Sequence, residues 1–126
     1  MALKFHHHQL RNGLDIVAEE NPDSHSFAAG LFVQTGARDE ESTINGVSHF
    51  LEHMLYRGSP SYRTAHEQAL AFEELGASLY AATQSDYGSM SLSLPPESLT
   101  RATAIFAEVV EAPRFSAIEI ERGIVR

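Results

Sequence analysis

Two histidines and a glutamate within one short segment are the most chemically distinctive feature of this sequence. The segment reads His49-Phe50-Leu51-Glu52-His53. Because residues three or four apart share one face of a helix, His49 and His53 can bind a single metal ion with Glu52 beside them. This H-x-x-E-H order reverses the H-E-x-x-H zinc helix and places a carboxylate where it can take a proton from metal-activated water. The segment predicts a metallohydrolase site, although two imidazoles do not complete a catalytic zinc site.

Length and composition limit the classes of protein to consider. The chain has 126 residues, of which 43% are hydrophobic and 21% charged, as expected for one globular domain or part of one. Its net charge of -8 argues against a nucleic-acid partner, because phosphate binding requires clustered Lys and Arg. The absence of cysteine excludes disulfides and thiolate ligands.

Membrane and targeting signals are not apparent in the sequence. No apolar run approaches the roughly 18 residues that a membrane-spanning helix needs. The N-terminus lacks the apolar segment of a secretion signal, which slightly favours the cytoplasm and leaves the compartment open. We therefore expect no membrane span.

Two hairpins and one further strand account for the β-structure that the sequence predicts. Residues 5–10 and 14–19 flank the turn dipeptide Asn12-Gly13, and residues 26–35 are mostly small and apolar. Residues 77–83 and 87–94 form the second predicted hairpin. Within it, Met90, Leu92 and Leu94 alternate with serines, which is typical of a half-buried strand.

Helical patterns occupy the intervening segments. The metal motif lies in a predicted helix over residues 46–56, and Thr64 with Glu67 forms a capping box that opens a helix ending before Gly76. A third helix is predicted over residues 97–111 and a fourth from Ser116. The order of elements predicts an α+β fold: a mixed, mostly antiparallel sheet with helices packed on one face.

A longer set of motifs supports a family resemblance. The chain resembles the inverted-motif zinc metallopeptidases, the family of pitrilysin, insulin-degrading enzyme and mitochondrial processing peptidase. The residues that carry the resemblance span nearly the whole chain in the family's order: 36–40 (GARDE), 46–59 (GVSHFLEHMLYRGS), 72–79 (FEELGASL), 113–115 (PRF) and 121–122 (ER). The resemblance implies an endopeptidase that hydrolyses peptides and binds one Zn2+ per complete site.

The family's site residues transfer to matching positions of this sequence. By resemblance, His49 and His53 are zinc ligands and Glu52 is the general base. The third ligand in the family is a glutamate seven positions beyond the one matched by Glu121, which corresponds to position 128, beyond Arg126. Glu121 itself is then expected to support a histidine ligand from the second shell of the metal.

The resemblance also implies a place for the peptide substrate. The family receives it at an edge strand, matched here by Tyr80, Ala81, Ala82 and Thr83. Tyr80 departs from the family, which usually has asparagine there. Because strand addition relies on backbone hydrogen bonds, this difference can alter specificity without abolishing binding, although Tyr80 is as easily explained by local packing.

Length is the larger departure from the family, whose members carry about two or four such domains. We expect residues 1–126 to be an N-terminal catalytic-type domain, truncated before its C-terminal end and inactive alone, with a second domain or partner subunit needed to close the chamber. One alternative is a non-catalytic partner or interaction module with an incomplete metal site. A lyase of the S-ribosylhomocysteinase type shares the motif, but its third ligand resembles a cysteine, which this chain lacks.

Overall fold

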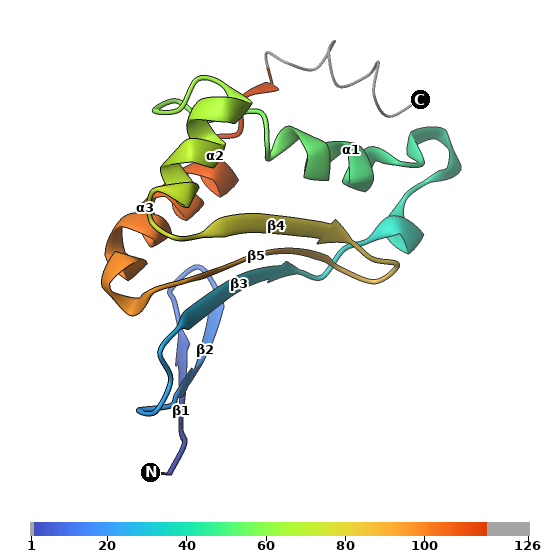
Figure 1. Cartoon of the computed structure of the whole chain (residues 1–126). Helices are drawn as coiled ribbons and strands as arrows, with labels where there is room; N and C mark the ends of the chain where they lie inside the picture. Colours follow the sequence, from blue (N-terminus) through green and yellow to red (C-terminus); the bar gives the residue numbers. More distant parts are fainter. Residues whose placement is uncertain (1, 116–126) are drawn as a thin grey trace.

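The strands form two antiparallel sheets in the computed structural model, which describes residues 2–115. Strands β1 (Lys4–Gln9) and β2 (Asp15–Glu20) pair as an isolated hairpin. Strands β3 (Phe27–Val33), β4 (Ser78–Thr83) and β5 (Gly88–Leu94) form the larger sheet in the order β3-β5-β4. Strand β4 therefore lies at an edge of this sheet, and no strand of the described residues pairs with its other side (Figure 1).

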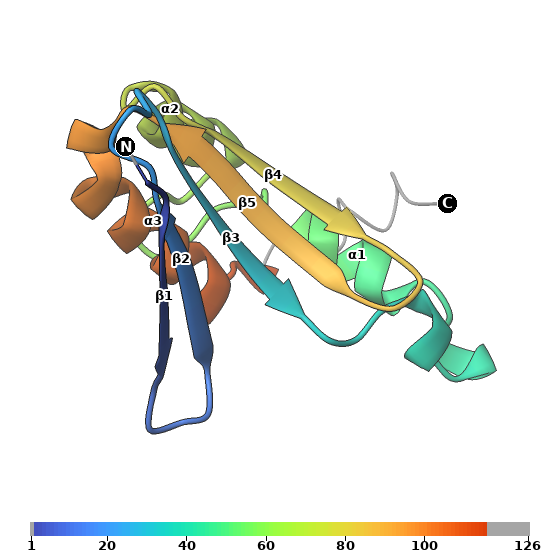
Figure 2. The same ribbon diagram turned by 90° about the horizontal axis from the view of Figure 1, so that it is seen from below.

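In residues 2–115, three α-helices lie on the same face of the larger sheet. They are α1 (Val47–Met54), α2 (Ala65–Glu73) and α3 (Leu99–Glu111). Figures 1 and 2 show α1 above β4, with α2 and α3 toward the opposite end of the sheet. Short 3-10 turns at Ala37–Asp39, Ser42–Ile44 and Pro96–Ser98 lead into these elements. The predicted α+β class, with antiparallel strands and helices on one face, is confirmed.

Strand β5 and helices α2 and α3 supply most of the hydrophobic core. The predicted alternation in β5 is observed: Met90, Leu92 and Leu94 are at most 5% exposed and face the helices. Phe72 of α2 and Val109 of α3 pack against them and are almost completely buried. Burial of each such large side chain contributes about 1.5–3 kcal/mol, so this core holds the helices in place against the sheet.

The first hairpin differs from the single mixed sheet that the sequence suggested. Every residue of β1 and β2 is exposed, and neither strand pairs with β3. Figure 1 shows the hairpin on the side of the larger sheet away from the helices. Phe5 and Val17 lie on one face of the hairpin but remain 69% and 74% exposed, so the hairpin buries little apolar surface, and surface ion pairs such as Lys4 with Glu20 contribute little.

Element boundaries also differ in detail from those predicted. Helix α1 ends at Met54 rather than at Tyr56, and β3 is shorter than residues 26–35. The helix predicted from Ser116 and the second-shell residue Glu121 lie outside the described residues, and the incompleteness of the domain stays a prediction. Within residues 2–115, no helix combines the length and apolar character required to cross a bilayer.

Helix α2 begins with the capping box that the sequence predicted. Thr64 Oγ1 accepts a hydrogen bond from Glu67 N at 3.1 Å, and Thr64 N donates to Glu67 Oε2 at 3.2 Å. Two backbone N–H groups at the helix start are thereby satisfied reciprocally. Since α2 carries Phe72 into the core, this cap supports the packing of the whole helix layer.

Replacing the cap gives a direct test of its contribution. We expect Thr64→Ala to lower the free energy of unfolding by about 1 kcal/mol, because the Glu67 N–H loses its side-chain acceptor. Urea denaturation followed by circular dichroism measures the change. The matched control is Thr103→Ala on the exposed surface of α3, for which we expect a change within about 0.5 kcal/mol. Equal effects of the two substitutions would contradict the assigned cap.

Candidate active site

Helix α1 brings the two predicted histidine ligands together. His49 Nε2 and His53 Nε2 are 3.0 Å apart, and the ring centroids are separated by 4.7 Å at an interplanar angle of 66°. The four-residue spacing on a helix accounts for this, because one turn separates the two side chains. His49 is exposed and His53 is half-buried, so the pair lies at the protein surface with open access.

The histidine pair fits a shared zinc ion. Two zinc–imidazole bonds of about 2.0–2.1 Å at a tetrahedral angle place their nitrogens about 3.3 Å apart. The 3.0 Å between the two Nε2 atoms requires only a small rotation of the rings to reach that spacing. Nitrogen donors from imidazole also suit zinc chemically.

A third protein ligand is not found in the part of the chain described. Among residues 2–115, no group of three or more His, Cys, Asp or Glu side chains is arranged to hold a metal ion. The position predicted for the metal-closing glutamate lies beyond Arg126, and Glu121 lies outside the described residues. The described site is therefore a two-nitrogen donor set, with Glu52 nearby on the same helix.

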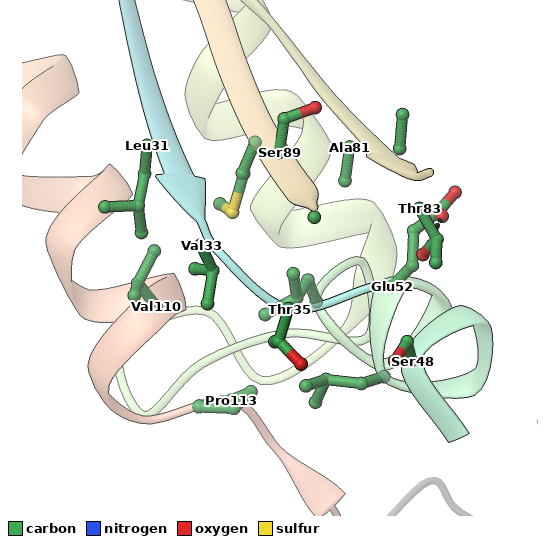
Figure 3. A pocket seen from close by; sticks show the side chains of 15 residues that line it. Leu31, Val33, Thr35, Ser48, Glu52, Ala81, Thr83, Ser89, Val110 and Pro113 are labelled. Atoms are coloured by element: carbon green, nitrogen blue, oxygen red, sulfur yellow. Dashed lines mark hydrogen bonds between the residues drawn. The ribbon is translucent and has the colours of Figure 1, made fainter. Parts of the chain in front are cut away.

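Glu52 does not turn toward the two histidines as a third ligand would. Its Oε2 atom accepts a hydrogen bond of 2.7 Å from Thr83 Oγ1 at the end of β4. Figure 3 shows the two side chains directed toward each other at one end of a cavity. The hydrogen bond fixes one carboxylate oxygen and connects the motif helix to the edge strand. The family resemblance predicted that Thr83 lies on the substrate strand, but it did not predict this hydrogen bond.

An apolar cavity lies beside Glu52, between α1 and the sheet. Its volume is about 210 Å³, and its walls are mainly aliphatic side chains from α1, the strands and the end of α3. Figure 3 shows Val110 and Pro113 at the end opposite Glu52 and Thr83, with Leu31 and Val33 along the side. The cavity provides apolar surroundings on one side of the carboxylate.

The N-terminus of α1 is held by a residue that the sequence analysis did not single out. Glu40 accepts hydrogen bonds from Gly46 N and Ser48 N at 2.5 and 2.7 Å. Gly46, the N-cap, adopts a left-handed conformation with φ of 93°, which glycine tolerates without strain. A carboxylate at this position satisfies free N–H groups and complements the positive end of the helix. Glu40 therefore sets where the motif helix begins.

These hydrogen bonds also change the acidity of Glu40. The Ser48 side chain, together with the N–H groups of Ser48 and Gly46, lowers the pKa of Glu40 from its usual value of 4.5. The deprotonated carboxylate is the form that holds the helix. The only sequence-level signal for this role is an acidic residue shortly before a helix that lacks a side-chain cap of its own.

The predicted substrate strand, residues 80–83, belongs to β4 at the edge of the sheet. Successive side chains of a strand point to opposite faces, and here Ala81 is buried toward the helices while Tyr80 is 65% exposed. Tyr80 therefore points away from α1 and its histidines. Its role in substrate specificity, and the substrate role of this strand as a whole, stay predictions.

Comparison with known proteins identifies the family. A sequence model of the family described as Insulinase (Peptidase family M16) matches residues 15–126. This chain belongs to the M16 peptidase family. It corresponds to the N-terminal part of the family's members, as the resemblance predicted.

The sequence is also similar to those of individual M16 proteins. The chain is 35% identical over 112 residues to "Uncharacterized zinc protease YmxG" of Bacillus subtilis (strain 168), covering 89% of this chain and 27% of that protein. It is 29% identical over 118 residues to the mitochondrial-processing peptidase subunit beta of Neurospora crassa, covering 92% of this chain and 25% of that subunit. It thus spans about a quarter of the length of these relatives.

The fold agrees with a solved M16 structure. The crystal structure of pitrilysin superposes with a TM-score of 0.84 at 25% sequence identity, covering 98% of this chain and 13% of that one. The match in fold therefore extends over nearly the whole of this chain. The names of the M16 relatives support a zinc peptidase function for the family.

Acid provides a test of the cap on α1. We expect Glu40→Gln to lower the melting temperature at pH 7, where the wild-type carboxylate is charged. Because the pKa of Glu40 is lowered in the folded state, its stabilisation is fully present above the unfolded value of 4.5 and is lost as pH falls through the folded pKa. The difference between variant and wild type should therefore vanish in acid, as measured by calorimetry from pH 7 to pH 3.

The neighbouring substitution Glu41→Gln is the control, because it removes the same charge from an exposed position while the hydrogen bonds to the start of α1 come from Glu40. A difference for Glu40→Gln that persists unchanged at low pH would contradict the role of the carboxylate.

Proposed function

We propose that this chain supplies the catalytic domain of a zinc endopeptidase. The observation that carries the proposal is the pair of Nε2 atoms 3.0 Å apart on α1, beside a carboxylate that Thr83 orients at the sheet edge. In this proposal His49 and His53 are zinc ligands and Glu52 is the general base. A zinc ion at this position supplies Lewis acidity, which lowers the pKa of water and polarises an amide carbonyl.

Glu52 performs the proton transfers in the proposed reaction. Its Oε2 atom is held by Thr83, so Oε1 is the atom available to accept a proton from the attacking water. The same carboxyl group then returns that proton to the leaving amide nitrogen. The Thr83 hydrogen bond keeps the carboxylate turned toward the sheet edge, where the scissile bond is proposed to lie, and away from direct metal coordination.

The peptide substrate is proposed to bind along β4. Among the described residues no strand pairs with one side of β4, so the N–H and C=O groups on that side can pair with an extended peptide. Backbone pairing gives little dependence on substrate side chains. The residues concerned are Tyr80, Ala81, Ala82 and Thr83, of which Thr83 also touches the general base.

Further parts of the protein complete the proposed enzyme. A glutamate at position 128 is the proposed third zinc ligand, with Glu121 supporting the metal site from its second shell. A second domain or partner subunit is proposed to close the chamber over the peptide. Residues 1–126 alone are then expected to be inactive, since a two-histidine site does not complete catalytic zinc coordination.

The general base can be tested in the full-length protein that carries this sequence. We expect Glu52→Gln to lower kcat by at least about 10²-fold while zinc stays bound, because glutamine keeps the shape and an acceptor for Thr83 but cannot take a proton. Hydrolysis of a quenched fluorescent peptide and zinc content by mass spectrometry are the two measurements. Glu111→Gln on α3 is the control for loss of one acidic charge. Hydrolysis retained by the Glu52 variant would remove it from this role.

The third-ligand proposal can be tested on the short chain itself. We append two residues after Arg126, the second being glutamate in one version and glutamine in the other. The glutamate version should bind zinc about tenfold more tightly or better than either the glutamine version or residues 1–126, because it adds a charged oxygen ligand. Isothermal titration calorimetry gives the three affinities. Equal affinities would contradict a ligand at this position.

A further inference from the structure

The free edge of β4 can be assigned residue by residue. In an antiparallel pair, facing residues alternate between those that exchange hydrogen bonds and those that do not. Gln84 N donates to Tyr87 O at 2.9 Å, so the hydrogen-bonded positions of this ladder are the even-numbered residues of β4. The N–H and C=O groups of the odd-numbered residues Leu79, Ala81 and Thr83 therefore point to the open side of the sheet.

One of these edge groups already has a partner. The Tyr56 hydroxyl oxygen, just beyond α1, accepts a hydrogen bond of 2.5 Å from Ala81 N. An added peptide strand would offer one of its carbonyl groups to the same N–H. Burial, together with the nearby charge of Glu52, raises the pKa of Tyr56, so the hydroxyl is neutral at physiological pH. The central donor of the free edge is thus occupied by a neutral side chain of the same domain.

Tyr56 also lines two hollows, one beside Glu52 and His53 and the other beside the start of β4. One hollow of about 280 Å³ is lined by Glu52, His53, Tyr56, Arg57 and Ala65, on the catalytic side. The other, of about 200 Å³, extends past Tyr56 to the start of β4 at Ser78 and Leu79. Tyr56 and Ala65 belong to both linings, so both hollows border these two residues.

A residue that lines the second hollow has a side-chain atom with no hydrogen-bond partner among the described residues. Gln68 is 2% exposed, and its Nε2 donates to Leu55 O at 2.8 Å, which fixes the orientation of the amide. Its Oε1 atom is buried and accepts no hydrogen bond. Buried acceptors are nearly always satisfied, and Gln68 belongs to the lining of a hollow beside the start of β4. An N–H or O–H donor from a bound peptide would satisfy the Oε1 atom if it reached that buried position.

We propose that Tyr56 is a gate on the peptide-binding edge: its hydroxyl occupies the Ala81 N–H, and Tyr56 borders both the catalytic hollow and a second peptide subsite, lined by Gln68, Ser78 and Leu79. This inference rests on the proposed function, since it concerns how a peptide pairs with β4. A peptide that runs from Thr83 to Leu79 displaces the hydroxyl from Ala81. Gln68 Oε1 then accepts a donor from the peptide in the second subsite.

In the absence of peptide, the Tyr56 hydroxyl also protects the edge of β4 from pairing with other chains. An unpaired strand edge is a template for unwanted association with other chains, and native proteins cover or interrupt such edges. The Tyr56 hydroxyl satisfies the most central N–H of β4 until a peptide replaces it. Binding therefore exchanges one hydrogen bond for another at Ala81, and the affinity for peptide is lower than an open edge would give.

The test is Tyr56→Phe in the full-length zinc-loaded protein, which removes only the hydroxyl. The probe is a pool of randomised decapeptides that carry a fluorophore and a quencher. We expect KM to fall roughly two- to tenfold with kcat little changed, because the peptide carbonyl no longer competes with an internal acceptor for Ala81 N–H. Amide hydrogen exchange of Ala81, measured without peptide, should become faster in the variant.

Tyr87→Phe is the matched control, since it removes a hydroxyl from an exposed ring that contacts Phe32 and leaves the free edge of β4 untouched. Its KM and Ala81 exchange should equal those of the wild type. An unchanged or raised KM for Tyr56→Phe would overturn the gate, and a raised value would indicate that the hydroxyl donates to the substrate. Failure of the wild type to cleave the pool would instead refute the proposed function, and the gate with it.

Discussion

The contact between α1 and β4 is the constraint on which the candidate site depends. Two hydrogen bonds join β4 to α1 and the residues just after it, from Thr83 Oγ1 to Glu52 Oε2 and from Ala81 N to Tyr56 Oη. Both come from one segment of the edge strand, and their partners lie one helical turn apart in sequence. The helix is thereby fixed in rotation as well as position. Because the histidines share that helix, their direction relative to the strand follows from the same two bonds.

The remaining structure acts as support for this contact. At its start, α1 is held by Glu40. The loop after α1 turns at Gly58, which has a positive φ. Glu108 of α3 accepts hydrogen bonds from Ser59 Oγ and Ser61 N, so the loop after α1 is tied to the core helices. The apolar contacts of α2 and α3 with β5 supply most of the buried surface, and these polar ties determine where α1 lies on it.

Features that depend on residues close together in the sequence could be predicted. Contacts that depend on how α1 packs on the sheet could not. The Thr64 capping box and the buried face of β5 follow from local spacing. The convergence of His49 and His53 follows equally from helical geometry. The Glu52–Thr83 and Tyr56–Ala81 contacts join residues 31 and 25 positions apart. They require a particular rotation of α1 on the sheet, which no periodicity in the sequence specifies.

The two histidines of the candidate metal site lie close together on α1. At 3.0 Å the two Nε2 atoms are within hydrogen-bonding distance, so one neutral imidazole can donate to the other. A metal ion needs the lone pairs of both Nε2 atoms, so its binding requires the donating ring to carry its proton on Nδ1 instead. The two rings are brought together when α1 forms, because the four-residue helical spacing places them side by side. The conformational entropy of bringing them together is therefore lost on folding rather than on metal binding. A third ligand would then add negative charge and complete the coordination of the metal, while α1 already holds the two histidines side by side.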